Sequence, residues 1–106
     1  MCDNLANAGF SIGAAASFDE GRDSVVGCIA PHAILDAVRY VAERSNDTPL
    51  DAVFVACTSL KCAPVIAEAE AVIGIPVISS NSALAWDMAR LANLDIGAAG
   101  KVALYS

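Results

Sequence analysis

The chain has 106 residues, of which 57% are hydrophobic and 17% charged, and its formal net charge at pH 7 is −6. A chain of this length forms at most one domain with a modest core, and its acidic balance argues against nucleic acid and anionic membranes as partners. It opens on polar residues instead of a secretory signal and has no run of about 18 strongly apolar residues that could span a bilayer, which predicts a cytoplasmic protein.

The first half of the chain predicts a helix, a strand, a polar loop and a second helix. Residues 1–8 are expected to form the end of a helix, because Gly9 stands where a left-handed cap costs little. Residues 11–18 predict a weak strand of small residues, and residues 19–27 predict a polar loop. Residues 31–45 predict a helix, because they begin with a proline and their apolar residues recur with a helical period.

The second half alternates between short apolar runs and helical segments. Residues 52–56 are typical of a strand buried on both faces of a parallel sheet. A helix is expected over residues 63–73, a further buried strand over residues 76–79, and a third helix over residues 82–93. This alternation predicts an α/β fold with three layers, α/β/α, around a short parallel sheet with right-handed crossovers.

A cysteine follows the strand predicted over residues 52–56. Open α/β sheets bind their ligands at the carboxyl ends of the strands, so Cys57 is a candidate proton donor or nucleophile. The backbone N–H groups of Thr58 and Ser59 are expected to face the same crevice and to bind a carboxylate or an enolate oxygen. Alternatively, Cys57 is a small buried residue without chemistry, as most free cysteines are.

Small polar residues also follow the strand predicted over residues 76–79. Neighbouring parallel strands place their carboxyl ends side by side, so Ser80 and Asn81 are expected to join Cys57 at one edge of the sheet as substrate-binding residues. The alternative is that they only cap the next helix, a common role of serine and asparagine.

The remaining cysteines lack the spacing of a metal site. No C-x-x-C motif is present and His32 is the single histidine, so no zinc site is expected. A cytosolic context also disfavours structural disulfides. Cys62 is expected to pack near the start of the next helix, and Cys2 and Cys28 are expected to be small buried residues.

The two strand ends belong to a longer ordered series of residues. Its members are Cys57-Thr58-Ser59-Leu60-Lys61, Pro64-Val65-Ile66, Glu70, Gly74-Ile75-Pro76-Val77, Ser79-Ser80-Asn81, Ala83 and Trp86. Their order and spacing resemble the C-terminal half of the aspartate/glutamate racemase superfamily, in the branch of maleate cis-trans isomerase, arylmalonate decarboxylase and the ectoine-utilisation proteins. The resemblance covers most of the chain and is strongest over residues 51–94.

The resemblance implies a fold and a role for the cysteine. Members of the family have two similar α/β domains around a pseudo-twofold axis, with the active site between them, and use no metal, flavin or pyridoxal cofactor. Residues 1–106 are then a single racemase-like C-terminal domain, one half of that fold, with the N-terminal partner domain absent. By the same resemblance, Cys57 is the catalytic thiol, which exchanges a proton with the substrate carbon or assists a partner cysteine that adds to a double bond. The backbone amides of Thr58 and Ser59 would bind a substrate carboxylate.

One segment departs from the family pattern. Relatives tend to have Asp or Asn, then Glu, then Arg before the helix that corresponds to residues 31–45. Here Asp23 matches loosely, while Val25 and Cys28 replace the charged positions. This segment therefore supports no assignment of the substrate.

Two hypotheses of function remain open. In the first, the protein is a cofactor-independent cysteine-based enzyme acting on a small dicarboxylic acid, as a maleate isomerase-like isomerase, a racemase or a decarboxylase. In the second, it is a catalytically inactive fragment or association domain that retains the fold. Because its charged fraction is below the roughly one quarter usual for soluble domains, we expect an apolar surface to be buried in a homodimer or against a separate N-terminal domain or chain.

Overall fold

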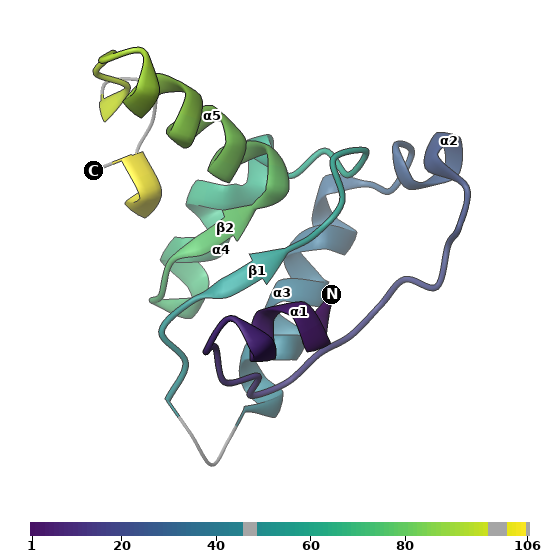
Figure 1. Ribbon diagram of the computed structural model, residues 1–106. Helices are drawn as coiled ribbons and strands as arrows, with labels where there is room; N and C mark the ends of the chain where they lie inside the picture. The colour runs from purple at the N-terminus through teal and green to yellow at the C-terminus, as the bar shows by residue number, and fades with distance from the viewer. Residues whose placement is uncertain (46–48, 98–101, 106) are drawn as a thin grey trace.

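Two short parallel strands pair at the centre of the protein (Figure 1). The structure is a computed structural model that describes residues 1–45, 49–97 and 102–105. Strand β1 (Val53–Val55) pairs with β2 (Val77–Ser79) in parallel, with Val53 opposite Val77 and Val55 opposite Ser79. The predicted parallel pairing of these two segments is confirmed, although each strand is shorter than expected.

The helices predicted from the apolar period are also present. Helix α3 (Pro31–Arg44) begins at the predicted proline, and a 3₁₀ turn, η1 (Ala63–Val65), leads into α4 (Ile66–Ile73). Helix α4 ends at Gly74, whose φ of 76° lies in the left-handed region that glycine adopts without strain. None of the helices in the described part of the chain combines the length and the apolar character that a membrane-spanning helix requires.

Helix α5 (Ser80–Leu91) starts two residues earlier than predicted. Ser79 is both the last residue of β2 and the N-cap of α5, so no loop separates the strand from the helix. Its hydroxyl accepts a hydrogen bond from the Ser82 N–H at 3.0 Å, and the Ser82 hydroxyl accepts one from the Ser79 N–H at 2.9 Å. This reciprocal capping holds the start of α5 rigidly at the end of β2.

The strand predicted over residues 11–18 is wrong. Helix α1 (Cys2–Asn7) ends before Gly9, whose φ of 97° agrees with the expected cap. Residues 10–22 then form neither helix nor strand, and almost all of their side chains are exposed. The small residues of the segment 11–18 offer too little apolar area to stabilise it as a strand of the sheet.

The loop predicted over residues 19–27 contains a helical turn. Helix α2 (Asp23–Val26) lies within it, and Val26 is buried with an exposed fraction of 8%. A single apolar side chain that reaches the core therefore gives this polar segment a defined position.

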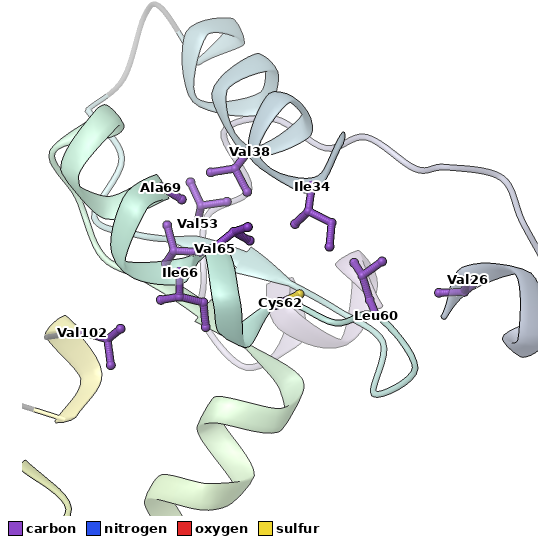
Figure 2. Close-up of a cluster of buried hydrophobic side chains, with 11 residues drawn as sticks. Val26, Ile34, Val38, Val53, Leu60, Cys62, Val65, Ile66, Ala69 and Val102 are labelled. Carbon is purple, nitrogen blue, oxygen red and sulfur yellow. The ribbon is translucent and has the colours of Figure 1, made fainter. Parts of the chain in front are cut away.

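The core lies between the sheet and two helices. Helices α3 and α4 pack against each other, α3 against β1 and α4 against β2. Figure 2 shows the buried cluster in this region, to which α2 contributes Val26 and the C-terminal segment Val102. Its members are Val26, Ile34, Val38, Val53, Leu60, Cys62, Val65, Ile66, Ala69, Val77 and Val102. On the opposite face of the sheet, Phe54 is 43% exposed. The structure thus shows a small α/β unit, while the full three-layer arrangement stays a prediction.

Glu70 links helix α4 to β2 and to the C-terminal segment. Its Oε1 accepts a hydrogen bond from the Val77 N–H at 3.0 Å, and its Oε2 accepts one from the Ala103 N–H at 3.0 Å. We expect Glu70→Gln to lower the free energy of unfolding by about 1 kcal/mol, because a neutral acceptor replaces a charged one and one acceptor oxygen is lost. Urea denaturation measures the change, and Glu68→Gln on the exposed side of α4 is the control. Equal effects of the two substitutions would contradict this role of Glu70.

Candidate active site

The carboxyl ends of β1 and β2 lie side by side, and two hydrogen bonds join the residues that follow them. The Cys57 N–H donates to the Ser80 Oγ at 3.2 Å, and the Asn81 Nδ2 donates to the carbonyl oxygen of Thr58 at 2.9 Å. The expected meeting of these residues at one edge of the sheet is therefore present. Their roles in catalysis and in substrate binding stay predictions.

Cys57 has an unusual backbone conformation. The backbone φ of Cys57 is 97°, in the region that favours glycine, and the residue is exposed. Such a conformation costs a non-glycine residue about 1–3 kcal/mol and persists only where the surroundings enforce it. Strain of this kind concentrates at functional sites, so the conformation of Cys57 supports a chemical role more directly than its sequence position does.

The residues after Cys57 form a tight turn. The Leu60 N–H donates to the Cys57 carbonyl oxygen at 3.3 Å, and the Leu60 side chain is buried, with an exposed fraction of 4%. Among the described residues, the N–H groups of Thr58 and Ser59 donate no hydrogen bond to another protein group. Two adjacent unpaired amides beside a thiol can bind a carboxylate or stabilise an oxyanion.

Cys62 lies in a different environment from Cys57. It directly precedes η1 and is buried with an exposed fraction of 3%, which confirms the expectation that it packs near a helix start. Burial raises the pKa of its thiol, and the nearby charge of an ionised Cys57 raises that pKa further. Cys62 is therefore a core residue that favours its neutral form.

The raised pKa of Cys62 predicts a pH dependence of stability. Because the pKa in the folded state lies above the ordinary value of 9.0, the folded protein retains this proton at a pH where the unfolded chain has released it. The stabilising contribution is present below pH 9.0 and is lost as the pH rises through the folded pKa. We expect the free energy of unfolding to fall less steeply between pH 9 and 10.5 in Cys62→Ala than in the wild type, as measured by urea denaturation. Identical slopes would contradict the contribution of Cys62.

Helix α2 borders the turn after Cys57. Val26 and Leu60 belong to the same buried cluster (Figure 2), and a Cβ atom placed on Gly27 would lie 3.6 Å from the carbonyl oxygen of Ser59. This neighbour of the site was not predicted, and its only signal in the sequence is an apolar pair, Val25 and Val26, within a polar stretch.

The other two cysteines do not behave as small buried residues. Cys28 is exposed and its Sγ donates to the Ser24 carbonyl oxygen at 3.3 Å, while Cys2 is half-buried. The expectation of burial was wrong for Cys28, because α2 and the turn that follows it lie at the surface and present this side chain to solvent. Among the residues that the structure describes, no three side chains of His, Cys, Asp or Glu are grouped to hold a metal ion.

Comparison with known proteins identifies a family. A family model described as arylmalonate decarboxylase matches residues 1–105, which is nearly the whole chain. No curated protein and no solved structure matches the chain significantly.

Proposed function

Because the chain belongs to the arylmalonate decarboxylase family, we propose that it is a cofactor-independent enzyme that acts on a small dicarboxylic acid through the thiol of Cys57. The observation that carries this proposal is the exposed, strained Cys57 beside the unpaired amides of Thr58 and Ser59. A proton donor next to two anion-binding N–H groups suits reactions that pass through an enolate of a carboxylic acid.

Decarboxylation of a substituted malonate is the reaction that this arrangement supports best. The bond between the α-carbon and one carboxylate breaks, carbon dioxide leaves, and the electron pair moves into the remaining carboxylate as an enediolate. The amides of Thr58 and Ser59 would bind that oxygen pair as its charge grows. The Cys57 thiol would give its proton to the α-carbon, and the resulting thiolate would regain a proton from water.

Decarboxylation requires only one proton-donating thiol, and this favours it over racemisation. Racemisation needs a proton donor and a proton acceptor on opposite faces of the α-carbon. Cys62 is the cysteine nearest to Cys57 in the sequence, but it is buried and its raised pKa favours the neutral thiol. The maleate isomerase-like and racemase activities are therefore second candidates.

Turnover of phenylmalonate tests the proposal. We expect the purified protein to form phenylacetate and carbon dioxide, followed by ¹³C NMR, and a parallel assay with maleate detects fumarate if the isomerase activity is present. Formation of fumarate without phenylacetate would replace decarboxylation by isomerisation. If the protein turns over neither acid, alone or together with a partner chain, the alternative of an inactive association domain would be favoured.

We further propose that the protein works as a homodimer. Leu84, Met88 and Leu91 on α5 are 57–68% exposed, and Phe54, at 43% exposed, lies on a face of the parallel sheet that is only partly covered, although such sheets are usually covered on both faces. Twofold pairing of identical chains is the commonest way to bury such a surface. Sedimentation at micromolar concentration should show a dimer, whereas a well-behaved monomer would point to a separate chain as the partner.

A further inference from the structure

The two hydrogen bonds between the Cys57 turn and α5 lie on either side of the strained backbone. One uses the N–H of Cys57 and the other the carbonyl oxygen of Thr58, so together they fix both ends of a two-residue segment. Both partners, Ser80 and Asn81, are the first residues of α5. The link joins positions that are 23 residues apart in the sequence.

The start of α5 is a rigid support for this segment. Ser79 and Ser82 form the reciprocal cap described above and are buried, with exposed fractions of 3% and 7%. A non-glycine residue at a φ of 97° relaxes unless its neighbours hold it. The hydrogen bond that Ser80 accepts from Cys57 and the one that Asn81 donates to Thr58 provide that restraint from a helix start that is itself held in place.

We propose that Ser80 and Asn81 are positioning residues that hold the Cys57 backbone in its strained conformation and thereby place the thiol, instead of residues that bind the substrate directly. The proposal concerns the site of the proposed function, and its expected effect on catalysis rests on that function. Its structural part, the restraint on the Cys57 backbone, is independent of any activity.

Nuclear magnetic resonance tests the structural part. In Ser80→Ala, we expect the hydrogen-exchange rate of the Cys57 amide to rise about tenfold, because its acceptor is lost. Ser80→Thr keeps a hydroxyl acceptor and should restore the rate. In Asn81→Ala, the ¹³Cα and ¹³Cβ chemical shifts of Cys57 should move toward the values of an ordinary negative φ. Ala85→Ser, at an exposed position of α5, is the control and should change neither signal.

Steady-state kinetics test the catalytic part. We expect Ser80→Ala and Asn81→Ala each to lower kcat about tenfold with little change in KM, because a displaced thiol reacts poorly with a substrate that still binds. Direct substrate binding by these side chains would instead raise KM. Ser80→Thr should recover most of kcat.

The outcomes separate the two proposals. Unchanged exchange rates and chemical shifts at Cys57 in both alanine variants would overturn the positioning role, as would a rise in KM at constant kcat. If the wild type shows no turnover, the proposed function fails, and the exchange and chemical-shift measurements still decide the restraint. A variant that unfolds would also lose the protection from hydrogen exchange of the amides in β2 and α4. In that case, the folded Ser80→Thr protein would be compared with Asn81→Ser, which has a shorter side-chain donor.

Discussion

Cys57→Ser is expected to lower turnover by at least about 100-fold, the usual loss on removing a proton-transfer group. Serine has nearly the shape of cysteine, and its hydroxyl can occupy the same exposed position at the end of β1. It is a much weaker acid than a thiol, so it gives up its proton to the α-carbon far more slowly. The substitution leaves the strained backbone conformation in place, so the free energy of unfolding should change little.

The other cysteines are the matched controls for this measurement. Cys28→Ser replaces an exposed thiol outside the link between the Cys57 turn and α5, and Cys62→Ser replaces a buried one. Both variants should retain most of kcat, although Cys62→Ser introduces a polar group into the core and should reduce stability. An equal loss of turnover in Cys57→Ser and Cys62→Ser, or no loss in Cys57→Ser, would defeat the assignment of the catalytic thiol.

Cys57→Gly is expected to be more stable than Cys57→Ala by about 1–3 kcal/mol, the usual cost of a strained backbone conformation. Both variants lack the thiol, so the comparison isolates the backbone. Glycine adopts a φ of 97° freely, whereas the Cβ of alanine meets the same steric conflict as the Cβ of cysteine. Thermal and urea denaturation of the two variants, neither of which should turn over substrate, measure the difference.

Gly74→Ala is the matched control, because it replaces a glycine of positive φ by alanine and should lower stability instead of raising it. Its φ is 76°, and a Cβ placed there would have no atom within 4 Å, so only backbone strain opposes the substitution. It should therefore destabilise the protein by an amount similar to the gain from alanine to glycine at position 57. If the glycine and alanine variants of Cys57 were equally stable while Gly74→Ala was destabilising, the strain at Cys57 would be refuted.

A substitution of Cys57 that stabilises the protein would also give information about the function of this residue. Natural proteins retain a strained residue where activity requires it, so a stabilising replacement at such a position usually removes activity. Loss of turnover in Cys57→Gly, together with greater stability, would separate the chemical role of this residue from any structural one.

The sequence by itself predicted the helices and strands between residues 31 and 91 and the family. The apolar run over residues 52–56 and the helical period over residues 31–45 are local patterns, which depend on neighbours a few residues away. The parallel pairing then follows from the alternation of strand and helix. The ordered series that begins at Cys57 and ends at Trp86 was sufficient to indicate the branch that the family match over residues 1–105 supports.

Only the tertiary structure decided the positions of the weak segments and the conformation of the site. Residues 11–18 do not join the sheet and Val26 reaches the core, because burial depends on which distant elements offer a partner surface. The strain at Cys57 likewise follows from hydrogen bonds to Ser80 and Asn81, which lie more than 20 residues away in the chain. Local propensity disfavours a φ of 97° for cysteine, so this conformation comes from contacts that no local pattern encodes.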